Sequence, residues 1–195
     1  WLDDYASPIL SRFPEALIEP VWLVDEEEGP ISWPAEPETL AGFVVGGGWV
    51  PGYLDALTPQ RTFITDLLRG GLPYLGFSAG AMIVAKHVIA GGWQYQGRQV
   101  APEIAGEGSI ELVISDGLGL IGPSIETHAD TQFILGRAVA ALRMGPMTTV
   151  ATIDEHTALA VDTTSGRSHV LGAGQVTWLS RDGDQVVIRA ERRAG

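Results

Sequence analysis

The stretch PYLGFSAGAMIVAKHVIAGG, residues 73–92, decides the fold of this chain. Residues 73–77 form a short apolar run typical of a buried strand, and residues 78–92 predict a helix that ends at a glycine pair. The junction between them carries a G-x-S-x-G pattern centred on Ser78. A serine at such a strand-to-helix turn is lifted out of the sheet, and the first N–H groups of the helix point toward it. The alternative is a glycine-rich turn in which Ser78 only caps the helix.

The segments around this stretch repeat the alternation of strand and helix. Alternation of this kind is typical of a mainly parallel sheet with helices on both faces. The C-terminal residues read instead as a meander with a hairpin signal at Asp182-Gly183, so antiparallel strands are expected there. We predict an α/β fold in a single domain, residues 1–195. Strands are expected within 41–48, 73–77, 111–128 and 149–164, and helices within 53–71, 78–92 and 130–145.

Composition narrows the classes of function. The chain has 195 residues, of which 45% are hydrophobic and 18% charged, as in globular proteins. The absence of cysteine excludes a disulfide scaffold, a thiolate zinc site and a cysteine nucleophile. A formal net charge of −12 argues against nucleic acid or an anionic membrane as the partner. No apolar run approaches the roughly 20 residues of a membrane span, and we expect a cytoplasmic protein.

A serine nucleophile needs a base, and the chain has four histidines. His128 follows a predicted strand and precedes a predicted helix. It should therefore lie at the carboxyl edge of the sheet, where ligand crevices form. His87 lies nine residues after Ser78 in the predicted helix, about 13 Å along it, and should point away. His128 is the predicted base, with a surface or structural histidine as the alternative.

The base needs a carboxylate that orients it, and Glu155 is the first choice. It lies beside Asp154 in the segment TIDEHTA, between two predicted strands. Glu126 and Asp130 flank His128, but a side chain two positions away on a strand projects parallel to the histidine and does not easily reach its ring. The alternative for Glu155 is an exposed turn acid. The chain order Ser…His…Glu differs from that of α/β-hydrolases, in which the acid precedes the histidine.

Three glycines, Gly46-Gly47-Gly48, follow the strand-like run AGFVV. Glycines at the carboxyl end of a strand let the backbone approach a ligand closely, so this turn could supply an N–H group to an oxyanion. The pattern does not match a phosphate-binding loop, because neither G-x-x-x-x-G-K-[ST] nor G-x-G-x-x-G followed by a helix is present. A purely structural tight turn remains the alternative.

The segments GFSAGAMIVAK, GLGLIGPSIETH and TIDEHTALAV, in this order and at these spacings, resemble the cyanophycinase and aspartyl dipeptidase (dipeptidase E) family of serine peptidases. The resemblance runs from about residue 40 to about residue 179. It implies a class I glutamine-amidotransferase-like fold, a flavodoxin-like three-layer sandwich. The family usually has a strand–helix–strand before the segment that opens this chain, so we expect these elements to be lacking here.

The resemblance also implies roles for individual residues. Ser78 would be the nucleophile, His128 the base, and Glu155 the third member of the triad. The oxyanion hole would be formed by N–H groups of Ala79 and of the glycine turn, at Gly47 or Gly48. The residues chosen from topology thus agree with those that the family motifs mark.

The resemblance implies that four residues contact the substrate: Trp49, Glu126, Thr127 and Arg137. Members often follow the glycine turn with Asn-Thr or Asp-Gln, where this chain has Trp49-Val50. The family's Asp-Thr/Gln-His appears here as Glu126-Thr127-His128. The arginine cluster that follows the histidine in cyanophycinases is reduced to Arg137, which argues against cleavage of the arginyl-aspartate polymer. Arg137 is the expected contact for an acidic residue of the substrate, and a helix-surface ion pair is its alternative role.

These features predict a serine peptidase that hydrolyses small peptides through an acyl-enzyme. A dipeptidase or exopeptidase is favoured, with specificity for an acidic residue or an isopeptide. Two alternatives stay open: an esterase or acyl-transfer enzyme with the same nucleophile, and a binding homologue without activity. The histidines have no H-x-x-x-H or H-x-H spacing, so neither a metal nor a cofactor is expected. The expected state is a monomer or homodimer.

Overall fold

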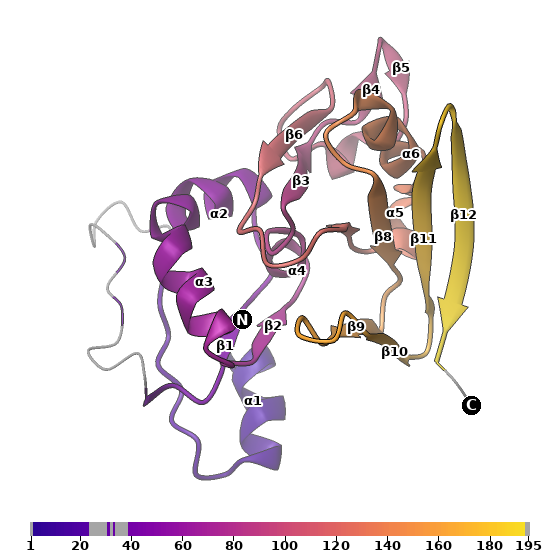
Figure 1. The fold of residues 1–195 in the computed structure, drawn as a ribbon. Helices are drawn as coiled ribbons and strands as arrows, with labels where there is room; N and C mark the ends of the chain where they lie inside the picture. Colours follow the sequence, from indigo (N-terminus) through magenta and orange to yellow (C-terminus); the bar gives the residue numbers. More distant parts are fainter. Residues whose placement is uncertain (1, 24–30, 32, 34–38, 194–195) are drawn as a thin grey trace.

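The computed structural model of the chain describes residues 2–23, 31, 33 and 39–193 (Figure 1). Its helical segments are α1 (Leu2–Arg12), α2 (Val50–Leu57), η2 (Thr58–Gln60), α3 (Arg61–Arg69), α4 (Ala79–Met82), η3 (Glu103–Gly106), α5 (Ala129–Gln132) and α6 (Leu135–Met144). Its strands are β1 (Phe43–Val45), β2 (Tyr74–Gly76), β3 (His87–Gly91), β4 (Gln94–Tyr95), β5 (Arg98–Gln99), β6 (Val113–Asp116), β7 (Ser124–Glu126), β8 (Thr149–Ile153), β9 (Thr157–Val161), β10 (Ser168–Gly172), β11 (Gln175–Asp182) and β12 (Gln185–Arg192). The predicted α/β class is confirmed.

Two pairs of parallel strands determine which segments meet. β1 runs parallel to β2, with Val45 opposite Gly76, and β7 runs parallel to β8, with Glu126 opposite Thr152. Parallel neighbours end at the same edge of a sheet. The glycine turn after β1 therefore adjoins the turn after β2, and the segment after β7 adjoins the turn after β8.

The sheet is less parallel than predicted. β8 and β11 pair antiparallel, as do β11 and β12, within a sheet of order β12-β11-β8-β7. β3–β6 and β9–β10 are antiparallel as well. Antiparallel strands near the C-terminus were expected, including the hairpin in which Asp182 pairs with Gln185. The mainly parallel three-layer sandwich is found only in part, because the strands form several separately paired groups instead of one continuous sheet.

The predicted helix over residues 78–92 is wrong beyond residue 82. α4 ends at Met82, and the chain then forms β3, which is paired with β6. Val88 and Ile89 are fully buried on this strand, and β-branched residues pack well in such positions. His87 consequently lies on a strand, with Nδ1 3.4 Å from a carboxylate oxygen of Asp116, and not on a helix.

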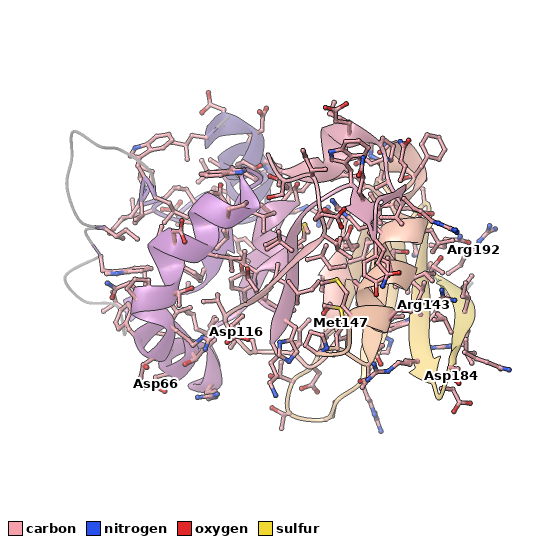
Figure 2. All side chains as sticks on the ribbon, turned by 90° about the horizontal axis from the view of Figure 1, so that it is seen from above. Asp66, Asp116, Arg143, Met147, Asp184 and Arg192 are labelled. Carbon is pink, nitrogen blue, oxygen red and sulfur yellow. The ribbon has the colours of Figure 1, made fainter. Side chains whose placement is uncertain are left out.

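The hydrophobic core has two main parts. One packs α2, α3 and α4 against β1 and β3, and the other packs α6 against β8 and β11. In Figure 2 the labelled charged side chains of Asp66, Asp184 and Arg192 lie at the outer edge of the molecule, whereas Met147 is 2% exposed within the second part. Within the described residues, no helix has the length and apolar character needed to cross a membrane.

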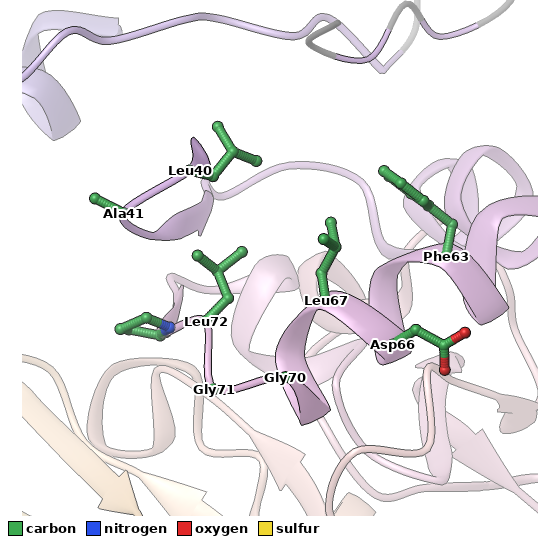
Figure 3. Close-up of a pocket in the computed structure, with 9 residues that line it drawn as sticks. Leu40, Ala41, Phe63, Asp66, Leu67, Gly70, Gly71 and Leu72 are labelled. Atoms are coloured by element: carbon green, nitrogen blue, oxygen red, sulfur yellow. The ribbon is translucent and has the colours of Figure 1, made fainter. Parts of the chain in front are cut away.

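A pocket of about 680 Å³ opens at the amino ends of β1 and β2 (Figure 3). It is lined by Leu40 just before β1, by Leu72 just before β2, and by Leu67 of α3, among others. Figure 3 shows Leu67 and Leu72 pointing toward the side on which Leu40 lies. The pocket is therefore at the opposite end of these two strands from Ser78, and it is separate from the site described next.

Candidate active site

Ser78 occupies a sharp turn between β2 and α4. Its backbone has φ 51° and ψ −119°, a conformation that residues other than glycine seldom adopt. Gly76 and Gly80 make the turn possible. A Cβ on Gly80 would overlap the carbonyl oxygen of Val45, and one on Gly76 would lie 2.7 Å from the backbone nitrogen of Ala81. Both glycines of the G-x-S-x-G pattern thus have a steric reason, and the turn presents Ser78 as a nucleophile elbow does.

A chain of hydrogen bonds joins Ser78, His128 and Glu155. Ser78 Oγ lies 2.8 Å from His128 Nε2, and Glu155 Oε1 lies 2.5 Å from His128 Nδ1. An ionised carboxylate can only accept hydrogen bonds, so Nδ1 of His128 carries a hydrogen and donates a hydrogen bond to Glu155. Nε2 is then the acceptor for the hydroxyl of Ser78. The structure brings together the three residues that the sequence marked.

Acids around His128 have distinct positions. Glu155 contacts the histidine ring, and its own backbone N–H donates to Asp130 Oδ1 at 2.9 Å. Asp130 therefore holds the glutamate and does not orient the histidine itself. The carboxylate of Asp154 accepts the N–H of Gln175 at 3.0 Å, at the start of β11. Of the acids considered from the sequence, Glu155 is the one whose side chain reaches the ring.

The glycine turn after β1 lies directly against Ser78. A Cβ on Gly47 would lie 3.2 Å from the Cβ of Ser78, and the N–H of Gly80 donates to the carbonyl of Gly46 at 3.2 Å. In the described part of the chain, the N–H of Ala79 has no hydrogen-bond acceptor, so it is available to a ligand. The N–H of Gly47, in contrast, donates to the hydroxyl oxygen of Tyr5 at 2.8 Å.

Most of this chain matches a known protein family. Residues 42–168 match the sequence profile of Peptidase family S51, a span that includes Ser78, His128 and Glu155. The chain belongs to peptidase family S51. The family predicted from the three motifs is therefore confirmed.

The S51 relatives are longer than this chain. Two proteins named cyanophycinase, one from Trichormus variabilis and one from Nostoc sp., are each 34% identical over 122 residues. These residues make up 62% of this chain but only 38% of each relative. The crystal structure of a peptidase from an acI-B1 Actinobacterium superposes with a TM-score of 0.53 at 23% identity, covering 77% of this chain and 58% of the other. A likeness at that level of identity concerns the fold alone.

Two of the predicted substrate contacts of this S51 chain are instead bound to each other. Glu126 and Arg137 form an ion pair with Nη2–Oε2 at 2.6 Å, and their side chains are 0% and 5% exposed. Arg137 Nε also donates to the same oxygen at 3.2 Å, and Nη1 donates to the carbonyl of Ala105. Burial raises the pKa of Glu126, and Arg137 offsets part of that rise. The expectation that Arg137 binds an acidic substrate residue, or that Glu126 touches substrate, does not fit this burial. A sequence holds no record of such a pairing between residues 11 positions apart.

The other two predicted contacts remain accessible. Trp49 is 55% exposed, and its indole Nε1 donates to the carbonyl of Glu107 at 3.1 Å. Thr127 is half-buried between Glu126 and His128.

Burial raises the pKa of Glu107, and a hydrogen bond from the N–H of Val50 together with the charge of Arg137 offsets part of the rise. The segment around Glu107 therefore connects the glycine turn to the buried ion pair.

Three tyrosines, which sequence reasoning missed, hold the backbone around Ser78. Besides Tyr5 on the N–H of Gly47, Tyr53 donates its hydroxyl to the carbonyl of Gly47 at 2.8 Å, and Tyr74 donates to the carbonyl of Gly80 at 2.6 Å. Burial raises the pKa of Tyr53 and of Tyr74, and in each case the charge of a neighbouring tyrosine raises it further. Tyr53 and Tyr74 are therefore neutral phenols whose hydroxyls donate hydrogen bonds to backbone carbonyls. The only signal in the sequence is that two of them lie within seven residues of a glycine turn or elbow.

Among the described residues, no group of three or more His, Asp or Glu side chains is arranged to hold a metal ion.

Proposed function

We propose that the chain is a serine peptidase that hydrolyses small peptides by a Ser78–His128–Glu155 triad. One observation carries the proposal: the continuous pair of hydrogen bonds, 2.8 and 2.5 Å long, from Ser78 through the imidazole to Glu155. A serine hydroxyl is a weak nucleophile on its own, and a base within hydrogen-bond distance is what activates it. Membership of peptidase family S51 supports the same class of reaction.

The first half of the reaction forms an acyl-enzyme. Ser78 Oγ attacks the carbonyl carbon of the peptide bond while its proton passes to His128 Nε2. Glu155 stabilises the imidazolium and keeps the proton on Nδ1. The negative oxygen of the tetrahedral intermediate is bound by N–H groups, of which Ala79 provides one. The C–N bond then breaks as Nε2 returns the proton to the departing amine.

Water completes the reaction. It attacks the acyl carbon as His128 takes one of its protons, and the ester bond to Ser78 breaks when the proton is returned to Oγ. The products are a carboxylic acid and an amine, and no external oxidant or cofactor enters the balance. Since Arg137 is paired with Glu126, the proposal includes no arginine that binds an acidic substrate residue.

Covalent labelling tests the nucleophile. A fluorophosphonate probe is expected to label the wild-type chain and to leave folded Ser78→Ala unlabelled. Labelling that persists in Ser78→Ala would contradict the proposal, and so would unlabelled wild-type protein whose circular dichroism is native. A panel of dipeptides and p-nitrophenyl esters then separates a peptidase from an esterase, because an esterase would cleave only the second group.

A further inference from the structure

The N–H group of Gly47 is already bound to a side chain of the same protein. Tyr5, on α1, accepts this N–H through its hydroxyl oxygen at 2.8 Å, although 42 positions separate the two residues. The oxygen lies 3.4 Å from the place that a Cβ on Gly47 would occupy, and the Cβ of Ser78 lies 3.2 Å from that same place. The hydroxyl oxygen of Tyr5 thus lies near Ser78. It accepts a hydrogen bond from the N–H of Gly47, the group that was expected to bind the oxyanion.

The ring of Tyr5 is held in this position by the surrounding residues. A Cβ on Gly46 would lie 2.9 Å from ring carbon Cε2 of Tyr5, so the ring rests on the glycine turn. Its edge faces the ring of Phe77 at a centroid distance of 5.8 Å, and Phe77 in turn lies 6.2 Å from the imidazole of His128. Figure 1 shows α1 beside β1 and β2, which agrees with these contacts. The ring of Tyr5 therefore packs between the glycine turn and Phe77, the residue before Ser78.

A second tyrosine binds the other side of the same residue. Tyr53 donates its hydroxyl to the carbonyl of Gly47 at 2.8 Å. This contact holds the peptide unit between Gly47 and Gly48 and does not involve the N–H of Gly47, whereas the contact with Tyr5 occupies that N–H. The hydroxyl of Tyr5 therefore occupies the N–H of Gly47, whereas the hydroxyl of Tyr53 does not.

We propose that Tyr5 competes with the substrate for the N–H of Gly47 and so determines which peptides reach Ser78. The inference rests on the proposed function. A backbone N–H makes one strong hydrogen bond, so the hydroxyl of Tyr5 and the carbonyl oxygen of a substrate exclude each other at this donor. A substrate binds productively only when its other contacts offset the displacement of Tyr5. The effect belongs to binding and not to the chemical step, so it raises KM and leaves kcat of the saturated enzyme nearly unchanged.

Tyr5→Phe tests this competition with the ring retained. Loss of one hydrogen bond of ordinary net strength predicts that KM for a cleaved dipeptide falls about fivefold, while kcat changes little. Tyr53→Phe is the matched control, because it removes the same hydroxyl from the carbonyl side of Gly47. No fall in KM is expected for the control. An unchanged or higher KM in Tyr5→Phe would overturn the proposal.

Hydrogen exchange at the amide of Gly47, followed by NMR on the full chain, makes the test independent of turnover. Exchange is expected to be about fivefold faster in Tyr5→Phe than in the wild type, and not accelerated in Tyr53→Phe. Unchanged exchange in Tyr5→Phe would overturn the proposal whatever the activity. Faster exchange in a chain that neither labels with a fluorophosphonate nor cleaves any peptide would refute the proposed function, yet would still support the hold of Tyr5 on Gly47.

Discussion

Replacing Arg137 by methionine is expected to destabilise the protein by about 3–5 kcal/mol, because it leaves a buried carboxylate without its counter-charge. The guanidinium is 5% exposed, and it donates twice to Glu126 and once to the carbonyl of Ala105. Methionine keeps most of the apolar stem, so the variant removes charge and donors with little change in packing. Glu126, which is 0% exposed, has no solvent to replace them.

The expected loss is large against the total stability of a domain, which is typically about 5–15 kcal/mol. With a urea m value of about 2 kcal/mol per M, a loss of this size lowers the unfolding midpoint by roughly 1.5–2.5 M. The fluorescence of the six tryptophans can report the transition. Arg143→Met on the same helix is the matched control, since Arg143 is exposed and its loss should change stability by less than about 0.5 kcal/mol. A loss below about 1 kcal/mol in Arg137→Met, or equal effects of the two variants, would refute the reasoning.

The loss in Arg137→Met should also depend on pH. Burial raises the pKa of Glu126, and removal of Arg137 takes away the charge that offsets part of the rise. A carboxyl group that binds its proton more tightly when folded stabilises the fold below its unfolded pKa, about 4.3, and loses that contribution as the pH rises through the folded pKa. Arg137→Met should therefore lose more stability than the wild type between pH 5 and pH 8. Adding Glu126→Gln should remove the extra loss, and a pH-independent difference would contradict this explanation.

Three further predictions concern the site itself. Glu155→Gln should lower kcat by about 10³- to 10⁴-fold in a folded protein, since an amide does not stabilise the imidazolium, and an unchanged kcat would remove Glu155 from the mechanism. Gly80→Ala should abolish soluble expression because its methyl group would overlap the carbonyl oxygen of Val45, whereas Gly122→Ala, with no atom within 4 Å of the added carbon, should express and melt like the wild type. Tyr74→Phe should lower the free energy of unfolding by about 1–2 kcal/mol, measured in urea, because it leaves a buried carbonyl unpaired; a neutral effect would show that water replaces the hydroxyl.

The meeting of Ser78, His128 and Glu155 could be predicted from the sequence. Each residue lies just after an apolar run. The rule that the carboxyl ends of parallel strands share an edge brings His128, after β7, beside Glu155, after β8. Ser78 follows β2, which pairs with β1 in another sheet, so its contact with His128 depends on how the two sheets pack. The steric reason for Gly76 and Gly80 also follows from the pattern alone.

Other features depend on contacts between distant segments, which a local pattern does not contain. The run after Met82 is apolar enough for a helix or a strand, and it becomes β3 only because β6 supplies the hydrogen-bond partner. The pairing of Arg137 with Glu126 requires α6 to pack beside β7, which no spacing within the sequence specifies. Tyr5 reaches Gly47 for a similar reason, since α1 and the glycine turn are brought together by the tertiary fold.

The backbone conformations of Ser78 and His128 also have a consequence for the evolution of the sequence. Ser78 has φ 51° and His128 has φ 59°, and a residue other than glycine in these backbone conformations costs about 1–3 kcal/mol. The serine and histidine that carry out the reaction therefore occupy backbone conformations that favour glycine. A lineage released from selection for activity could replace either residue by glycine and gain stability with the change. In such descendants, loss of turnover and a rise in unfolding temperature would be inherited together.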